Sequence, residues 1–549
     1  MWAFTLAAHV PDSWEAVIVD SIFESTAGIG PSDVFAFSGI NQDVDCIRRV
    51  HDELKDRYPE ATFIVGGPIT WSLEQERKLD ILEYFDFIFV LDGEETLPRF
   101  LIDLDSGNID PLLKIIRTDR FSLTKARKIR FDLYRPKADH YYGALVEVSR
   151  GCPFLCEFCD IRVLPGNNQS HTKNIDLIIE EMDEYYKLGI TQFQFACDNF
   201  IGDIVWARKC VDAIIEWKQR TGAKIAIFTW LTINLYKMPD LMQKMGDAGF
   251  SILFIGIESV NQNSLLETAK VQNNLALDQA VRTIQSYGFI IAPGFIFGFD
   301  SDTEHVFDET LDFLKNSGLI GGDPSFLMAL PGTPLFARMK KAGRLIDEDT
   351  ATVRNKITTN IRYLLDAGAM VDGFIYFMET YTSPEFQLAR YKNHVSMLME
   401  SDTLISQEGS GYGSPLEYIQ LQFKDMSRLK DLFRRIFFIT KKPLVLWAVL
   451  QAWWLTKKCT RQYPGLGLHF NYWVYVWTNM AVKYRGLNIK DFAISSVGAD
   501  FDISTIIESM GKEGASSDAP HVKGDVKVSH QRRYTEKALR KLANDRLNT

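Results

Sequence analysis

Three cysteines lie close together in the sequence, Cys152, Cys156 and Cys159, with the spacing C-x3-C-x2-C. Three thiolates on one short loop can hold three irons of a cubane iron–sulfur cluster and leave the fourth iron open to another ligand. A structural zinc site normally uses four protein ligands, and the next candidate, His171, lies further on in a polar segment. Free structural cysteines prefer apolar surroundings, whereas charged residues flank these three. The spacing therefore predicts a 4Fe–4S site.

The cysteine segment follows a strand-like run at 144–149 and carries an aromatic residue, Phe158, just before its last cysteine. In these features it resembles the signature of the radical SAM enzymes. The resemblance implies that the open iron binds the amino and carboxylate groups of S-adenosylmethionine (SAM), and that Phe158 lies near the adenine. It also implies that one electron from the cluster cleaves SAM to methionine and a 5′-deoxyadenosyl radical. We expect the electron donor to be a small redox protein such as flavodoxin or ferredoxin.

The composition limits the remaining choices. A chain of 549 residues, 46% of them hydrophobic, predicts two to four domains with sizeable cores. A formal net charge of −10 argues against a nucleic-acid partner. Seven cysteines, three of them clustered, do not form a disulfide pattern. The N-terminus lacks a secretory signal, and no apolar run is long enough for a transmembrane helix, so we expect a cytoplasmic protein.

Residues 1–107 alternate strand-like runs, the first at 16–20, with helix-like segments. This alternation predicts βαβ units and a parallel sheet. Ligands of such sheets bind at the carboxyl ends of the strands. The residues expected at those ends are Ser38, Gly39, Gly66, Gly67 and Gly93.

The order of three short motifs in this region, Ser-Gly-Ile, Val-Gly-Gly-Pro and Asp-Gly-Glu-Glu-Thr, is similar to the cobalamin-binding class of radical SAM enzymes. The resemblance implies a Rossmann-like domain of the cobalamin-binding type, in which the five strand-end residues contact cobalamin. The usual first strand is missing, so this domain is expected to be N-terminally shortened. The Asp-x-His-x-x-Gly motif that supplies an axial histidine is also missing. We interpret His9 and His51 as surface residues rather than cobalt ligands. The alternative to a domain that binds cobalamin is a module kept only as a scaffold.

Residues 108–143 are expected to form a connector with a basic, solvated stretch. Residues 144–340 then repeat a strand–helix alternation six times. Six parallel βα units form an open partial barrel, which is the (β/α)6 core that the resemblance implies. The predicted strands are 144–149, 192–196, 224–232, 251–257, 290–297 and 324–329.

Active groups of such barrels gather at the carboxyl ends of the strands. The resemblance places Asp198 near the amino group of SAM, with a helix N-cap as the alternative role. Glu258 would accept hydrogen bonds from the ribose, with a surface salt bridge as the alternative. Gly294 and Gly298 resemble the adenine-side G-x-I-x-G motif. The turn at 330–335 is assigned a structural role.

Residues 341–510 change to helical patterns, predicted at 349–367, 383–400, 414–437, 443–458 and 470–485. The segment 443–455 is apolar, contains paired tryptophans and has lysine pairs on both sides. This pattern suits an interfacial membrane helix, and a buried core helix is the equal alternative. The polar tail, 511–549, is expected to be disordered.

Three functions are compatible with these patterns. The first is a radical SAM methyltransferase that uses cobalamin to methylate an unactivated carbon, and the hydrophobic C-terminal region suggests a lipid-like or otherwise apolar substrate with peripheral membrane contact. The alternative is a radical SAM cyclase or oxidoreductase with a vestigial cobalamin domain. The third is a redox or interaction protein whose cluster only carries electrons, and such a protein would not need the predicted SAM contacts.

Overall fold

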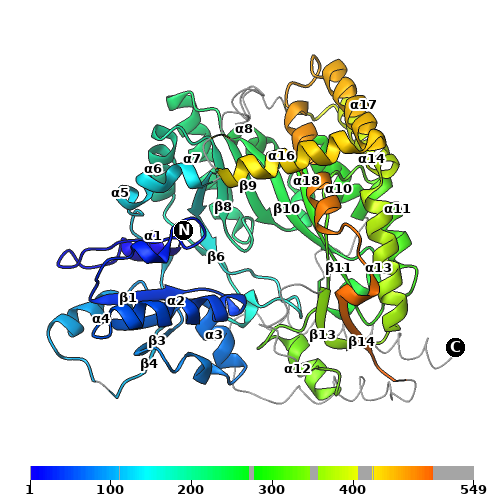
Figure 1. The fold of residues 1–549 in the computed structure, drawn as a ribbon. Coiled ribbons are helices and arrows are strands. Elements are labelled where there is room, and N and C mark those ends of the chain that lie inside the picture. The colour runs from blue at the N-terminus through cyan, green and yellow to red at the C-terminus, as the bar shows by residue number, and fades with distance from the viewer. Residues whose placement is uncertain are drawn as a thin grey trace.

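The computed structural model describes residues 2–110, 112–141, 143–270, 277–346, 357–405, 423 and 426–498. The predicted tail at 511–549 lies outside these described residues, as does the first part of the helix predicted at 414–437. Figure 1 shows three parts, which are an N-terminal parallel sheet, a central six-stranded sheet and a C-terminal helical region. The predicted α/β fold class is confirmed.

The N-terminal sheet has four parallel strands in the order β1–β2–β3–β4. They are β1 (Val34–Ser38), β2 (Thr62–Gly66), β3 (Phe87–Val90) and β4 (Ile115–Arg117), and the helices among them include α2 (Val44–Arg57), α3 (Pro68–Gln75) and α4 (Thr96–Asp105). Strand β4 lies in the segment expected to be a connector, so the sheet extends beyond residue 107.

The strand predicted at 16–20 does not form. Val17 and Val19 in this run are 75% and 40% exposed. A strand needs both a hydrogen-bonding neighbour and a covered apolar face, and the run has neither in the described structure. Its apolar composition was therefore a misleading signal.

The central sheet has six parallel strands in the order β5–β8–β9–β10–β11–β12, which is also their order along the chain. The strands are β5 (Ala144–Glu147), β8 (Gln192–Ala196), β9 (Ala226–Leu231), β10 (Phe250–Glu258), β11 (Ile290–Phe297) and β12 (Asp323–Phe326). The helices of this part are α6 (Ile175–Lys187), α7 (Ile204–Thr221), α8 (Pro239–Ala248), α9 (Gln262–Glu267), α10 (Leu277–Ser286) and α11 (Val306–Asn316). The predicted partial barrel is confirmed.

Local sequence explains why the barrel helices begin and end where they do. The side chain of Asn174 accepts the N–H of Asp176 in the first turn of α6, and that of Asp203 accepts the N–H of Trp206 in the first turn of α7. Gly222 ends α7 with a φ of 68°, a left-handed conformation that glycine adopts without strain. The connections between helices and strands are thereby fixed, and the strand ends that carry the candidate site are held in place.

The C-terminal region contains the helices α13 (Ala367–Thr382), α14 (Pro384–Met399), α16 (Met426–Lys441), α17 (Pro443–Cys459) and α18 (Leu466–Lys483). The helix predicted at 349–367 is wrong where the structure describes it. Residues 357–363 form the strand β13 (Ile357–Tyr363), which pairs with β14 (Phe492–Ser496). This segment is rich in β-branched residues, which favour a strand when a partner is present, and its partner is far away in the sequence.

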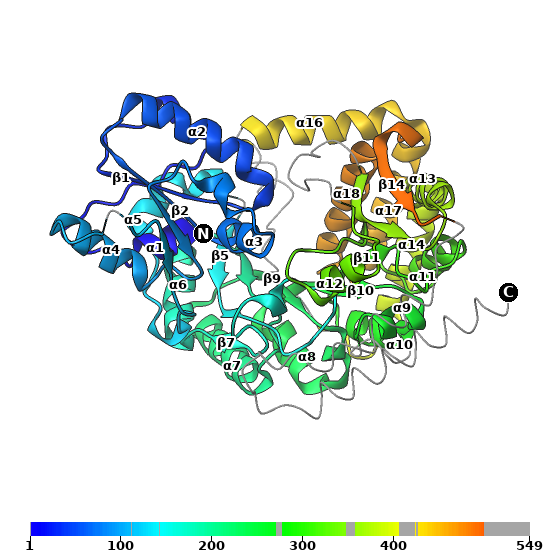
Figure 2. The ribbon, with the colours of Figure 1, turned by 90° about the horizontal axis from the view of Figure 1, so that it is seen from below.

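Two helices connect the three parts. In α1 (Trp2–Ala7), Phe4 belongs to the barrel core, while Leu6 packs on the N-terminal module. In Figure 2, α16 spans from the C-terminal helices toward the N-terminal part. Near its start, Arg428 lies close enough to Tyr134 to oppose the rise in the Tyr134 pKa that burial causes. The N-terminal module, through α1, and the C-terminal helices, through α16, therefore both contact the barrel part of the chain.

Candidate cluster and SAM site

The three cysteines lie in the loop between β6 (Ser149–Arg150) and β7 (His171–Thr172), two short strands that pair with each other. Gly151 begins this cysteine loop with a φ of 89°. A Cβ atom at Gly151 would lie 2.1 Å from the carbonyl oxygen of Gln169, so only glycine fits. The close approach brings both ends of the loop together and keeps the thiols on one compact segment.

The three thiols are close enough to influence one another. Burial raises the pKa of the Cys159 thiol to about 12 and also raises that of Cys152, and the neighbouring Cys156 adds to both shifts. Among the described residues, no three His, Cys, Asp or Glu side chains converge as a preformed metal site. When iron binds, these thiols would lose their protons and act as thiolate ligands. Three neighbouring thiols on one loop are the donor set that a 4Fe–4S cluster with one open iron requires.

A buried chain of charges holds the cysteine loop. Glu157, between two of the cysteines, accepts hydrogen bonds of 2.8 and 2.9 Å from Nε and Nη2 of Arg338 in α12 (Pro334–Lys341). Nη1 of Arg338 donates to Asp300 at 2.7 Å, and Arg344 donates two more hydrogen bonds to the same carboxylate. Burial acts to raise the pKa of Asp300, but the two guanidinium groups overcome it and hold the pKa well below its usual value. The turn at 330–335 starts α12 and thus has the structural role predicted for it.

Glu258 ends β10 at a point where the register with β11 shifts. Its φ is 66°, which is rare for a non-glycine residue and typical of functional sites. Its Oε1 atom accepts a hydrogen bond of 2.5 Å from Nζ of Lys270, and the two side chains are 11% and 7% exposed. A Cβ atom at Gly256 would lie 2.1 Å from Oε1 of Glu258, so the glycine makes room for the pair. Glu258 is thus in a buried ion pair rather than in the surface salt bridge considered as the alternative.

Lys270 is a functional candidate that the sequence analysis missed. Its Nζ lies 5.9 Å from the centre of the Phe158 ring. Burial acts to lower the pKa of Lys270, but Glu258 and Cys156 overcome it and the pKa is raised. A charged ammonium between the cysteines and a carboxylate suits a ligand with a carboxylate of its own. No motif surrounds Lys270 in the sequence, and only the fold brings it to Glu258.

Asp198 follows β8 and lies beside the cysteine loop, where its Oδ2 atom accepts the N–H of Gly151 at 2.6 Å. Burial raises the pKa of Asp198. It does not cap α7, because Asp203 has that role. The next residue, Asn199, was also missed: its Nδ2 lies 3.8 Å from the Cys152 sulfur, and its Oδ1 is buried without a hydrogen-bond partner in the described structure. An unsatisfied buried acceptor next to a cluster cysteine fits the amino group of SAM.

The two glycines of the predicted adenine-side motif have different surroundings. Gly294 pairs in register with Gly256, and a Cβ atom there would lie 3.8 Å from Oε2 of Glu258. Gly298 has a φ of 104°, and a Cβ atom there would lie 2.5 Å from the Tyr363 ring. Gly294 therefore belongs to the neighbourhood of Glu258, whereas Gly298 makes room for a buried tyrosine. The adenine contact stays a prediction for both.

The residues predicted to contact cobalamin gather at the carboxyl ends of β1, β2 and β3. Glycine is needed there for packing within the module. A Cβ atom at Gly67 would lie 2.2 Å from Oγ of Ser38, and one at Gly93 would lie 3.3 Å from Leu6. At Gly39 the Asp43 carboxylate occupies the same space. These glycines do not line an open cavity for a ligand. The feature that favours a ligand here is the location at the carboxyl edge of the sheet, not the glycines.

This edge of the N-terminal sheet contacts the cysteine loop directly. Arg150 donates to Glu94 at 2.6 Å and to Glu147 at 2.7 Å, and its Nη1 lies 3.4 Å from Asp92. Asp92 also accepts a hydrogen bond of 2.7 Å from Arg120. Asp92 and Glu94 belong to the Asp-Gly-Glu-Glu motif after β3. A ligand bound at this edge would therefore lie next to the cysteine loop.

The prediction that His9 and His51 are surface residues is wrong. They are 7% and 4% exposed, and Nε2 of each lacks a hydrogen-bond partner in the described structure. His51 lies on the same face of α2 as Ile47 and Leu54, which is buried against the sheet. Burial lowers the pKa of His9 to about 4, with Arg127 adding to the shift, so this side chain is neutral. Helical spacing alone placed His51 on the apolar face and could have identified it as buried.

Comparisons with known proteins show what this part of the chain is similar to. The model of the radical SAM superfamily matches residues 146–314, and a domain of unknown function, DUF4070, matches residues 333–480. The chain is 29% identical over 401 residues to the hopanoid C-2 methylase of Rhodopseudomonas palustris, a match that covers 71% of this chain and 72% of that protein. It is 30% identical over 362 residues to an uncharacterized methyltransferase of Synechocystis sp., covering 65% of each.

Among solved structures, the cobalamin-dependent SAM radical enzyme OxsB, with aqua-cobalamin and SAM bound, resembles this chain in fold. The TM-score is 0.52 at 13% sequence identity, and the match covers 92% of this chain and 75% of that one. At this identity the likeness concerns the fold alone. It extends over nearly the whole chain and is therefore not confined to the barrel.

Proposed function

Because the chain belongs to the radical SAM superfamily, we propose that it is a cobalamin-dependent methyltransferase acting on an unactivated carbon of a lipid-like molecule. The observation that carries the proposal is the extent of the match to the hopanoid C-2 methylase. The matched 401 residues are more than twice the 169 residues of the superfamily match, so the relationship extends beyond the barrel.

Different residues of the barrel would bind the cluster and the separate groups of SAM. The cluster and SAM, when bound, supply the one-electron cleavage of SAM that starts the radical chemistry. The three cysteine thiols would hold the cluster. Lys270 would pair with the carboxylate of SAM, Asn199 would accept from its amino group, and Glu258 would accept from the ribose hydroxyls.

The N-terminal module would hold cobalamin at the carboxyl edge of its strands, beside Arg150. Cobalamin, when bound, supplies the methyl group that is transferred. Ser38 and Gly66 are the contacts we propose, because neighbouring side chains occupy the space beside Gly39, Gly67 and Gly93. The electron donor, flavodoxin or ferredoxin, and a cytoplasmic location with peripheral membrane contact are also proposals, and they follow from the chemistry of the cluster and of the substrate.

The test uses protein purified without oxygen and reconstituted with iron, sulfide and hydroxocobalamin. We expect stoichiometric cobalt, formation of 5′-deoxyadenosine, and transfer of a deuterated methyl group from labelled SAM to a hopanoid lipid, detected by mass spectrometry. Cys156→Ala is expected to abolish all SAM cleavage and is the matched negative control. If 5′-deoxyadenosine forms but neither cobalt nor labelled lipid is found, the methyltransferase proposal is rejected.

A further inference from the structure

Helix α17 carries apolar side chains on all sides, but the described part of the chain covers only one of its faces. Val445, Ala448 and Ala452 are buried where α17 packs on α14 and α18. The opposite face carries apolar side chains that are each at least 48% exposed, namely Leu444, Trp447, Leu450, Trp453 and Trp454. A soluble helix with no partner normally has a polar outer face. A large exposed apolar stripe therefore indicates a surface that something else covers.

Helix α16 continues this apolar surface. Phe433, Ile436 and Phe437 on α16 are 59%, 45% and 60% exposed. The two helices contact each other and meet at a bend of 104°. Within the described residues, no single helix is long and apolar enough to cross a membrane. A sharply bent pair with exposed aromatic residues suits the boundary between lipid headgroups and acyl chains.

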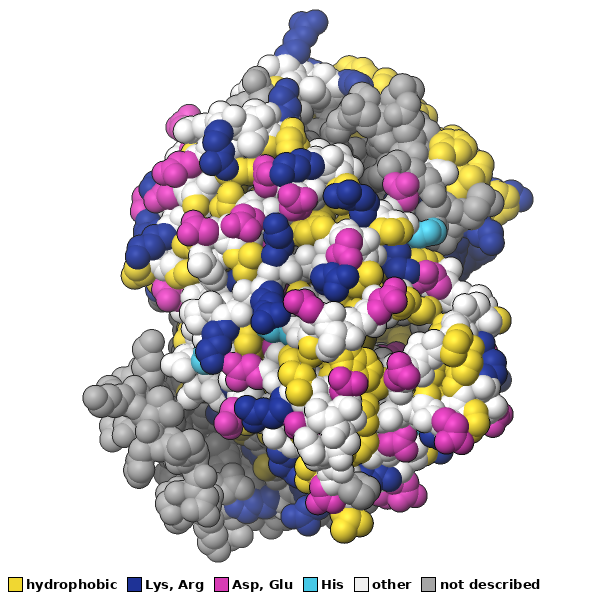
Figure 3. All heavy atoms as spheres, turned by 90° about the vertical axis from the view of Figure 1, so that its left-hand side faces the viewer, with side chains coloured by type: hydrophobic (Ala, Val, Ile, Leu, Met, Phe, Trp, Pro, Cys, Tyr) yellow, Lys and Arg dark blue, Asp and Glu magenta, His cyan; other side chains and the backbone are white. Residues whose placement is uncertain are grey.

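Positive charge surrounds the apolar side chains. Nine lysines and arginines but only one acidic residue lie between Met426 and Arg461, in a chain whose formal net charge is −10. Lysine pairs stand at both ends of α17, and Nζ of Lys457 and of Lys458 lie 5.9 and 5.8 Å from the Trp453 and Trp454 rings. By contrast, Figure 3 shows charges of both signs interspersed on the face that includes the N-terminal part. The α16–α17 surface is thus distinct in composition.

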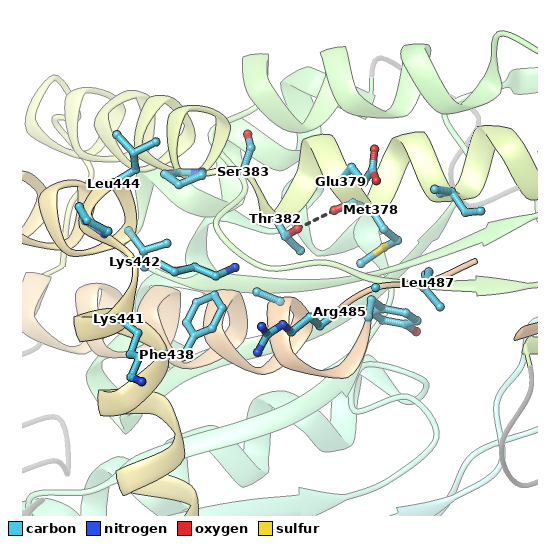
Figure 4. Close-up of a pocket in the computed structure, with 17 residues that line it drawn as sticks. Met378, Glu379, Thr382, Ser383, Phe438, Lys441, Lys442, Leu444, Arg485 and Leu487 are labelled. Carbon is cyan, nitrogen blue, oxygen red and sulfur yellow. Dashed lines mark hydrogen bonds between the residues drawn. The ribbon is translucent and has the colours of Figure 1, made fainter. Parts of the chain in front are cut away.

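A cavity of about 530 Å³ opens at the bend between α16 and α17 (Figure 4). Its walls are mostly apolar and include Met378 and Phe438, and Leu444 belongs both to the cavity and to the exposed stripe. In Figure 4, the side chains of Lys442 and Arg485 extend into the cavity. Glu379 is the only acidic side chain among the lining residues. Apolar walls with three basic residues in the lining, Lys441, Lys442 and Arg485, suit a molecule that is apolar at one end and anionic at the other.

We propose that the exposed side chains of α16 and α17, together with this cavity, dock the protein on an anionic lipid bilayer. The tryptophans and leucines of α17 would enter the headgroup–acyl boundary, where such residues are favoured. The lysine pairs would contact lipid phosphates, and Lys442 and Arg485 would receive one anionic headgroup. A second copy of the chain is a poorer occupant, because it would bring a surface of the same charge.

This surface performs no chemistry. It rests on the peripheral membrane contact of the proposed function and assigns that contact to named residues, and it would give a lipid-like substrate a route to the enzyme. The test is co-sedimentation of the full chain with vesicles of phosphatidylglycerol and phosphatidylcholine, compared with phosphatidylcholine alone. We expect binding only to the anionic vesicles, with affinity falling as salt is added.

Two sets of variants separate the apolar and charged contributions. Trp447→Ser with Trp454→Ser is expected to lower the vesicle partition coefficient at least tenfold. Lys457→Gln and Lys458→Gln are each expected to lower it about fivefold. Trp2→Ser, which removes a tryptophan that is 50% exposed in α1, is the matched control and should leave binding unchanged.

Several outcomes would overturn the docking proposal. The first is equal binding to both vesicle types, and the second is unchanged vesicle binding by the tryptophan variant. The third is that the unmodified protein binds no vesicles but forms a stable dimer on gel filtration, and that the tryptophan substitutions dissociate this dimer. The formation of 5′-deoxyadenosine should be the same in all variants and reports that they are folded. Vesicle binding without methyl transfer would reject only the proposed function, and methyl transfer without vesicle binding would reject only the docking surface.

Discussion

Replacing Arg338 with methionine tests whether the buried chain of charges holds the cysteine loop. Arg338 is 7% exposed and makes three hydrogen bonds, two to Glu157 and one to Asp300. Removing it leaves the Glu157 carboxylate, only 14% exposed, without its partner, while Asp300 keeps Arg344. Breaking one side of a buried ion pair costs about 3–5 kcal/mol. Since one of the two carboxylates remains paired, we expect the free energy of unfolding to fall by about 3 kcal/mol.

The effect should also reach the cluster. Glu157 stands between Cys156 and Phe158, so its release loosens the segment that carries two of the three thiols. After anaerobic reconstitution and gel filtration, Arg338→Met should retain markedly less iron per chain than the unmodified protein. Arg338→Lys keeps the charge but not the bidentate geometry. We therefore expect its free energy of unfolding and its iron content to lie between those of Arg338→Met and the unmodified protein.

The control is a surface ion pair on the same barrel. Arg208 pairs with Asp240, and the two side chains are 35% and 61% exposed. Arg208→Met should lower the free energy of unfolding by only about 0–1 kcal/mol and should leave the iron content unchanged. Denaturant titration gives the first quantity, and a colorimetric iron assay gives the second. The reasoning would be refuted if the two methionine variants lost the same free energy of unfolding, or if Arg338→Met kept its full iron content.

Two further predictions concern SAM binding and pH. Lys270→Met should keep its cluster but bind SAM about 10- to 100-fold more weakly, because it loses a charge-assisted hydrogen bond. The change in the electron paramagnetic resonance spectrum on SAM addition measures the affinity for SAM. An unchanged affinity would exclude Lys270 from the site. His394 and His469 are buried and lie 2.8 Å apart, and burial lowers the pKa of His394 to about 4 and that of His469 well below its usual value. Their stabilising contribution is complete above pH 6.5 and is lost as the pH falls toward 4, by about 1.4 kcal/mol per pH unit for each histidine. Thermal unfolding between pH 7 and pH 5 should therefore show a flatter dependence in His394→Gln, and identical slopes would contradict the assignment.

The features that the sequence predicted well are those determined by local patterns. All six barrel strands were predicted nearly in place, because each is a short apolar run between helical segments and the sheet takes them in chain order. The position of the cysteine loop follows from the C-x3-C-x2-C spacing alone. Glu258 was selected as a candidate because it directly follows an apolar strand, and parallel strands present such residues at a common edge; its contact with the ribose stays a prediction.

The features that were missed depend on residues far apart in the chain. Glu157 and Arg338 are 181 residues apart, and nothing in the sequence near either one indicates a partner. Strand β13 was taken for a helix because its partner, β14, follows it only after five of the described α-helices. Lys270 is an exception, because it is only 12 residues from Glu258; it was missed because no periodic pattern distinguishes it from a solvated lysine. Contacts of this kind become visible only when the fold is known.

The contact between the N-terminal sheet and the cysteine loop bears on whether that module is merely a scaffold. A scaffold would need only apolar packing against the barrel, which α1 already provides through Phe4. Instead, Asp92 and Glu94 extend from the carboxyl edge of the sheet to Arg150, two residues before the first cysteine. Any ligand that displaced or reoriented these acids would change the charge beside Arg150, and the backbone of Gly151 would transmit the change to Asp198. The carboxyl edge of the module is therefore connected to the cluster loop by polar contacts, as expected if a ligand at this edge and the cluster act on one substrate.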